Sequence, residues 1–149
     1  PQPVPYVESE SHRAQGAIDI RLEVSIETHR MREAGLPAET MSRTSFCHHY
    51  WSIAQMLTHH AAGGCNLQPG DLLGSGTISG PELSEAGALM ELALAGNKPV
   101  QLGNGERRSF LEDGDAIIFQ GWCEREGFNR IGFGFNHGRV LPAVSPSAE

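Results

Sequence analysis

Hydrophobic and polar residues alternate strictly in the first part of the chain. Between residues 17 and 28, Ile18, Ile20, Leu22, Val24 and Ile26 are separated by single polar or charged residues. Alternation with a period of two predicts a β-strand with one buried and one wet face. The polar stretch 29–39 contains Gly35 and Pro37 and is predicted to be a hairpin loop, after which residues 40–43 pair back as a short strand.

The hydrophobic period then changes from two to that of a helix. Phe46, Tyr50, Ile53, Leu57 and Ala61 follow one another at helical spacing, which predicts one amphipathic helix over about residues 46–62. Thr44 or Ser45 is placed to cap its start, and Gly63-Gly64 to end it.

The remainder of the chain is predicted to consist of short strands and turns. Strands are expected at 71–75, 88–94, 116–120, 129–135 and 139–141, with a hairpin joining 98–102 to 107–111 through Asn104-Gly105. Residues 112–115 read as a turn and 144–149 as a frayed tail. The predicted fold class is α+β and mainly β: a mixed-sheet roll or sandwich crossed by one amphipathic helix.

Composition narrows the class of protein. A chain of 149 residues is one domain's worth, and its 18 glycines and 9 prolines suit many turns. A net charge of −7 argues against nucleic acid or an anionic membrane surface as a partner. No apolar run is long enough to span a bilayer. The opening residues 1–5 read as a linker, so we expect a fragment of a longer polypeptide.

Glu91 is the residue that most needs a chemical explanation. It follows the glycine-rich stretch 74–82 and lies within the apolar run 88–94. On a strand it would share a side with Leu89 and Ala93, and a carboxylate on a buried face is costly unless it is paired. A structural carboxylate bonded to amides or an arginine is one interpretation. The other is a general base, or the partner of a histidine base, beside a substrate loop.

Other candidate chemistry is weaker. The pairs His48-His49 and His59-His60 would lie about 16 Å apart along one helix, so capping or packing roles are favoured over a metal site. Cys47, Cys65 and Cys123 form no C-x-x-C pair, which favours buried, inert thiols in a reducing, cytosolic compartment. The glycine-rich stretch lacks the ending of a phosphate-binding P-loop.

Several sequence motifs together resemble the C-terminal part of the fumarylacetoacetase family. They are Tyr50-Trp51, Gln55-Met-Leu-Thr-His-His60, Gly64-Cys-Asn-Leu67, Pro69-Gly-Asp-Leu-Leu73, Ser75-Gly-Thr-Ile-Ser-Gly-Pro-Glu82, Leu102-Gly-Asn-Gly105, Phe110 to Asp115, Arg130-Ile-Gly-Phe-Gly134 and Val140-Leu-Pro142. The resemblance covers about residues 3–143, as the C-terminal portion of a catalytic domain.

The resemblance implies a hydrolase that cleaves a carbon–carbon bond in a β-diketo acid. Its substrate would be 4-fumarylacetoacetate and its products fumarate and acetoacetate, at the end of tyrosine and phenylalanine catabolism. By the family pattern, Glu91 orients the catalytic histidine and Thr77 hydrogen-bonds the substrate. Gly76 and Gly80 give backbone access to it. The family uses Mg²⁺ or Ca²⁺, and its members resemble cytosolic homodimers.

This chain departs from the family pattern in what it lacks. The family's catalytic histidine, carboxylate metal ligands and lysine are expected upstream, so no metal ligand is assigned here and the fragment alone is expected to be inactive. Two alternatives stay open: a non-catalytic dimerisation or structural module that kept the fold, and a hydrolase of a related acylpyruvate or diketone.

Overall fold

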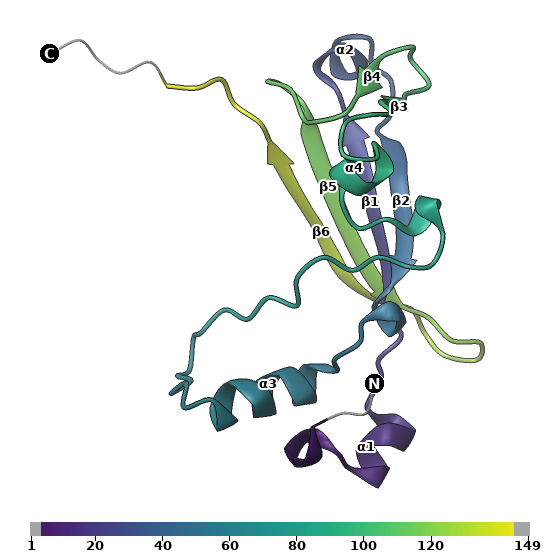
Figure 1. Ribbon diagram of the computed structural model, residues 1–149. Coiled ribbons are helices and arrows are strands. Elements are labelled where there is room, and N and C mark those ends of the chain that lie inside the picture. The colour runs from purple at the N-terminus through teal and green to yellow at the C-terminus, as the bar shows by residue number, and fades with distance from the viewer. Residues whose placement is uncertain (1–3, 145–149) are drawn as a thin grey trace, which may run out of the picture.

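A four-stranded antiparallel sheet forms the centre of the computed structural model, which describes residues 4–144. Its strand order is β2 (Glu39–Ser45), β1 (Arg21–Glu27), β5 (Ala116–Cys123) and β6 (Ile131–Arg139) (Figure 1). The α+β, mainly β class is confirmed. The mixed pairing expected from the sequence is not seen in the described residues, where β1–β2, β1–β5 and β5–β6 all pair antiparallel. The connections β1–β2 and β5–β6 are too short for the crossover that parallel neighbours require.

The strand predicted at 17–28 is confirmed as β1, but its burial does not alternate strictly. Ile26 is fully buried and forms a small core with Met31 and Leu102. Its neighbour Ser25 is buried as well, and Ile18 is exposed. Partly buried Met41, Val100 and Ile117 pack around these three side chains. The core therefore packs β1 against Met31, which follows it closely in the chain, and against Leu102, which is far along the chain.

The connection between β1 and β2 contains a helix where a loop was predicted. α2 (His29–Glu33) starts at Thr28, whose hydroxyl accepts a hydrogen bond from the Met31 amide at 3.1 Å. An N-cap of this kind stabilises a first helical turn. Met31 is buried, so the helix is also anchored by the core.

The predicted helix at 46–62 starts later in the structure. α3 spans Ile53–Ala62, and a separate 3-10 turn occupies Phe46–His48. Ser52 and Gln55 form a reciprocal capping box at the start of α3, which is a stronger start signal than the periodicity that suggested residue 46. Ser45 does act as a cap, but of the 3-10 turn.

Two further strand predictions were wrong, and two predicted strands are one in the structure. Residues 88–94 contain a short helix, α4 (Leu89–Leu92), preceded by a 3-10 turn at Leu83–Glu85. Residues 71–75 form no strand. β6 is continuous through the stretch that was divided into 129–135 and 139–141.

The remaining elements are short. The predicted hairpin at Asn104-Gly105 is confirmed, with β3 (Val100–Gln101) pairing with β4 (Arg107–Arg108). A 3-10 turn (Pro5–Val7) and α1 (Glu10–Gln15) precede β1. Of the predicted tail at 144–149, residues 145–149 lie outside the described residues.

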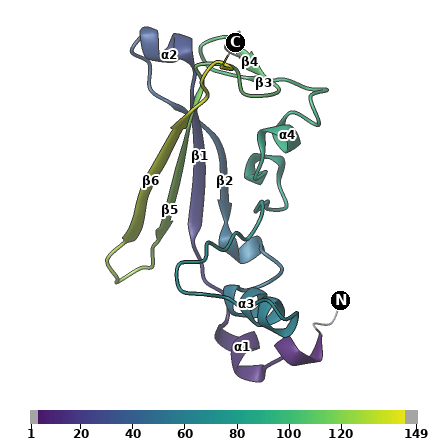
Figure 2. The same ribbon diagram turned by 90° about the vertical axis from the view of Figure 1, so that its left-hand side faces the viewer.

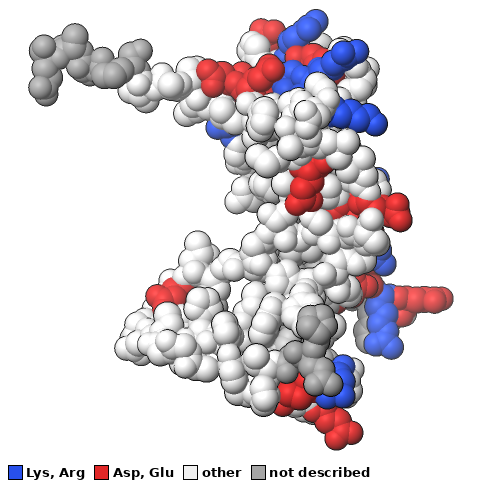
Figure 3. Space-filling view, viewed as in Figure 1, with Lys and Arg blue, Asp and Glu red and all other residues white. Residues whose placement is uncertain are grey.

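The elements divide along the length of the sheet. α2, β3 and β4 lie at one end, α1 and α3 lie beyond the other, and α4 stands beside one face (Figures 1 and 2). Charged side chains gather at the end with α2, whereas the surface over α3 is mostly uncharged (Figure 3). None of the helices within residues 4–144 has the length and hydrophobicity needed to cross a membrane.

Candidate active site

The glycine-rich stretch 74–82 crosses the molecule as an irregular segment between α3 and α4. Thr77 is exposed on it, next to Gly76, whose φ of +79° is a conformation that favours glycine. Gly80 is held by the segment itself: its amide donates to the Glu85 carbonyl at 3.0 Å. The Glu85 side chain lies where a Cβ on Gly80 would stand. Gly76 is therefore open to a ligand, whereas Gly80 is packed internally.

Glu91 lies on α4 and is exposed, so the burial predicted from a strand was wrong. The Glu91 side chain is exposed on this helix, whereas Ala93 at its C-terminal end is fully buried. Its Oε2 accepts hydrogen bonds from the Ser79 hydroxyl at 2.6 Å and from the Gly87 amide at 3.3 Å. Among residues 4–144, no side chain or amide bonds its Oε1.

This arrangement leaves one carboxylate oxygen available for a further donor. An ionised carboxylate accepts several hydrogen bonds, so Oε1 can receive one from an imidazole N–H. A carboxylate in that position fixes the tautomer of a histidine and stabilises its protonated form. Glu91 thus has an acceptor available for a histidine N–H, and its role as the partner of a histidine stays a prediction.

A cavity of about 500 Å³ adjoins this segment. Its lining combines aromatic, polar and aliphatic side chains: His48, His49, Tyr50, Trp51, Met56, Ser75, Thr77, Ile78 and Ser79. The cavity brings Thr77 and Ser79 together with the residues before α3, which lie far from them in the sequence. A substrate bonded to Thr77 would have room here, and this role of Thr77 likewise stays a prediction.

His49 ties the two walls of this cavity together. Its Nδ1 lies 2.6 Å from the Trp51 carbonyl oxygen, and its Nε2 lies 2.9 Å from the Ser75 carbonyl oxygen. His59 contacts the Tyr6 hydroxyl at 2.7 Å instead, and His48 lies 3.7 Å from Glu85. The two histidine pairs do not gather, which agrees with packing roles.

No group of three or more metal-ligating side chains was found in the described part of the chain. Glu91, the carboxylate that the family pattern places near the substrate, directs Oε2 at two hydrogen-bond donors. Mg²⁺ and Ca²⁺ require several oxygen ligands around one point. Residues 4–144 therefore do not by themselves fit either ion.

The cysteines differ from the buried thiols that were expected. Cys47 and Cys65 are exposed and Cys123 is half-buried, and all three are free. The Cys47 thiol lies 3.8 Å from the Ile18 carbonyl oxygen, and among the described residues no histidine ring pairs with it. Within residues 4–144, none of the three has the base partner that a cysteine nucleophile needs.

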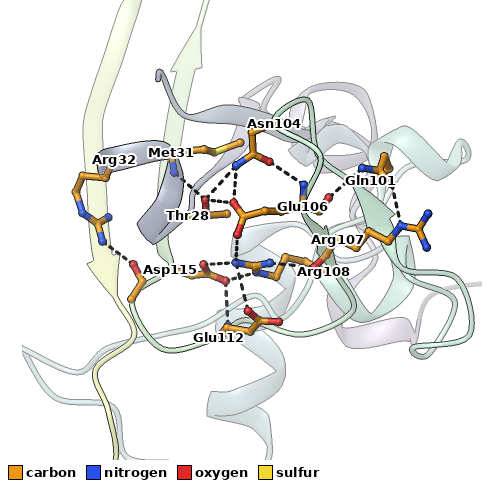
Figure 4. Close-up of polar contacts among 11 residues, drawn as sticks. Thr28, Met31, Arg32, Gln101, Asn104, Glu106, Arg107, Arg108, Glu112 and Asp115 are labelled. Carbon is orange, nitrogen blue, oxygen red and sulfur yellow. Dashed lines mark hydrogen bonds and ion pairs between the residues drawn. The ribbon is translucent and has the colours of Figure 1, made fainter. Parts of the chain in front are cut away.

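A buried polar network holds the β3–β4 hairpin against the sheet (Figure 4). Arg108 donates to both oxygens of Asp115, at 2.8 and 3.1 Å, and also to Glu106 at 3.2 Å. The hydrogen bonds and charge of Asp115 raise the pKa of Arg108. Glu106 accepts from the Thr28 hydroxyl at 2.5 Å, and this bond is the largest cause of its lowered pKa. The network positions the hairpin that follows α4.

Ser79 and Gly87 are the site residues that the sequence reasoning missed. A signal for Ser79 was present: it is two residues from Thr77, so in an extended segment both side chains fall on the same side. No comparable signal marked Gly87. Its Cβ, if present, would lie 2.4 Å from the Ile78 carbonyl oxygen and 2.6 Å from Thr77 Cγ2.

Comparison with known proteins gives one consistent family. Residues 4–135 match the family model described as fumarylacetoacetate (FAA) hydrolase C-terminal. The chain is 47% identical to fumarylacetoacetase of Homo sapiens over 147 residues, which cover 99% of this chain and 33% of that protein. Identity is 48% to the protein of the same name from Bos taurus and 43% to that from Oryza sativa, over 97% of this chain in each case.

The chain spans about a third of the length of these curated relatives. Their match extends over the glycine-rich stretch, α4 and the β3–β4 hairpin. The chain therefore belongs to the fumarylacetoacetate hydrolase family and corresponds to its C-terminal part.

Proposed function

We propose that this chain is part of an enzyme that hydrolyses the carbon–carbon bond of 4-fumarylacetoacetate, giving fumarate and acetoacetate. The observation that carries the proposal is the placement of Glu91: bonded through Oε2 to Ser79, open at Oε1, and linked through Ser79 to the stretch that carries Thr77. Family membership supports the same substrate class, because the relatives matched are named fumarylacetoacetase.

Each proposed residue has one role. The Thr77 hydroxyl hydrogen-bonds the bound substrate, and the exposed backbone at Gly76 approaches it closely. Glu91 accepts the N–H of a histidine that lies outside residues 4–144. The other ring nitrogen of that histidine then removes a proton from water. The water oxygen attacks the carbonyl carbon, the carbon–carbon bond breaks, and the departing carbanion takes up a proton to become acetoacetate.

A divalent cation, Mg²⁺ or Ca²⁺, belongs to the proposal through the family resemblance. In this chemistry such an ion supplies charge stabilisation for oxygens of a diketone. Its ligands would lie outside residues 4–144, since those residues do not fit it by themselves, and no step above depends on it.

We also propose that the enzyme is a cytosolic homodimer. The large exposed apolar side chains Phe119, Phe133 and Phe135 on β5 and β6 support a covering surface from outside these residues. Three free cysteines support a reducing compartment. Light scattering on the complete polypeptide tests the dimer, and a monomeric mass would contradict it.

The direct test is turnover by the complete polypeptide that contains this chain. Fumarylacetoacetate, with Mg²⁺ or Ca²⁺ added, should be consumed with release of equal amounts of fumarate and acetoacetate. An acylpyruvate serves as the comparison substrate. Preferential cleavage of the acylpyruvate would replace the proposed substrate by a related diketone, and no cleavage of either would favour a non-catalytic structural module.

A further inference from the structure

Ser79 lies between Glu91 and the substrate side of the candidate site. Its hydroxyl donates to Glu91 Oε2 at 2.6 Å and accepts from the Gly87 amide at 3.0 Å. A serine hydroxyl has a single hydrogen. Because the amide N–H can only donate, this hydrogen is directed to the carboxylate.

The two bonds restrict a side chain that would otherwise be mobile. Glu91 is exposed on a helix of four residues, and a free glutamate loses considerable rotamer entropy when it is fixed in place. Ser79 and Gly87 together hold the carboxylate through Oε2, and Oε1 has no hydrogen-bond partner among residues 4–144. The Glu91 carboxylate is therefore held in place before a histidine forms a hydrogen bond with it.

Gly87 allows the segment before α4 to approach the backbone of the glycine-rich stretch closely. Only a residue without a Cβ fits there, because that atom would lie 2.4 Å from the Ile78 carbonyl oxygen. Thr77, Ser79 and Glu91 are consequently held in one unit, with Thr77 facing the cavity and Ser79 bonded to Glu91.

We propose that Ser79 is a positioning residue for this reaction: its hydroxyl sets the orientation of Glu91 and so the alignment of the general base. The inference rests on the proposed function, since it assigns Ser79 a role only through Glu91. Ser79 itself touches no reacting atom in this assignment.

The experiment uses the complete enzyme and three serine variants. Ser79→Ala should lower kcat by roughly ten- to a hundred-fold, as loss of a supporting hydrogen bond usually does. KM should stay within about two-fold, because substrate contacts are retained. Ser79→Thr keeps the hydroxyl and should restore most of the rate. Ser84→Ala, in the exposed turn nearby, is the matched control and should equal wild type.

A double-mutant cycle separates positioning from general support of the fold. If Ser79 acts through the Glu91 carboxylate, adding Ser79→Ala to Glu91→Gln should lower kcat no further. Independent losses that multiply, or a wild-type kcat in Ser79→Ala, would overturn the inference. Either result would leave the proposed function intact provided that the wild-type enzyme cleaves fumarylacetoacetate. A wild-type enzyme without that activity would instead overturn the proposed function, and the inference with it.

Discussion

Two polar clusters within residues 4–144, around Arg108 and around Glu91, are held in contrasting ways. Around Arg108, charged groups are buried and bonded on nearly every side: the Arg108 and Asp115 side chains are 7% and 1% exposed. Around Glu91, the carboxylate is exposed and only one of its oxygens is bonded within residues 4–144. The first cluster is complete within the described chain, whereas the second presents an unused acceptor.

The contrast indicates different purposes for the two clusters. A buried ion pair must be fully bonded, because an unpaired charge in the interior is expensive. A group that acts on a substrate or a catalytic partner must keep part of its bonding capacity free. Changes in the Arg108 cluster should therefore affect stability, and changes around Glu91 should affect turnover.

The largest expected effect is on turnover, from Glu91→Gln in the complete enzyme. The substitution keeps the shape of the side chain but removes its charge, so the histidine base is no longer stabilised when protonated. We expect kcat to fall roughly 10²- to 10⁴-fold, the usual contribution of acid–base catalysis. Steady-state kinetics and thermal unfolding should show lost activity with an unchanged midpoint. Glu33→Gln, also an exposed glutamate on a short helix, is the control, and near-normal turnover in Glu91→Gln would refute the role.

Next in size is the loss of stability from Arg108→Met. It leaves the buried Asp115 carboxylate without its arginine, and breaking a buried ion pair costs about 3–5 kcal/mol. Urea unfolding of the complete polypeptide measures the change. Arg107→Met is the matched control, because the adjacent side chain is exposed and bonds only Gln101 among the described residues. Equal effects of the two substitutions would contradict the structural role of the network.

Gly87→Ala should produce smaller losses, and these should affect both stability and turnover. The added methyl group would meet the Ile78 carbonyl and Thr77, and overpacking of this kind typically costs about 1–3 kcal/mol. It would also displace the amide that bonds Ser79 and Glu91. We expect a lower unfolding midpoint together with a lower kcat. Gly105→Ala is a useful contrast: nothing lies within 4 Å of the added carbon, and only the positive φ is strained. Wild-type stability and kcat in the Gly87→Ala variant would show that Gly87 is not tightly packed against Ile78 and Thr77.

The smallest expected effect is the pH dependence contributed by Glu106. Its pKa is lowered below the usual 4.5, first by the Thr28 hydroxyl, so the folded state favours the ionised form. The resulting stability is present above pH 4.5 and is lost as the pH falls through the lowered value. Unfolding measured against pH should lose part of its acid dependence in Glu106→Gln. Glu112→Gln, exposed and also near Arg108, should retain it, and identical pH profiles would contradict the assignment.

Sequence patterns predicted the strand with a sustained alternation and the hairpin with a strong turn signal. The alternation at 17–28 located β1, and Asn104-Gly105 located the β3–β4 hairpin. The run 88–94 was misassigned because a short apolar stretch does not distinguish a strand from a buried helical turn. Its content of Leu, Met and Glu favoured a helix, and the positive φ of Leu94 and Ala95 ends it.

The sequence by itself determined the family and the α+β class. It also located the stretch that contains the candidate site residues Thr77 and Glu91, because motifs and periodicity are local properties. Only the tertiary structure decided that Glu91 is exposed and bonded by Ser79, and that Arg108 rather than Arg107 is buried. Arg107 and Arg108 are neighbours on β4, so their side chains face opposite sides. Which of the two is buried depends on which side of the hairpin packs against the rest of the molecule. Such contacts join residues distant in the sequence, and packing fixes them.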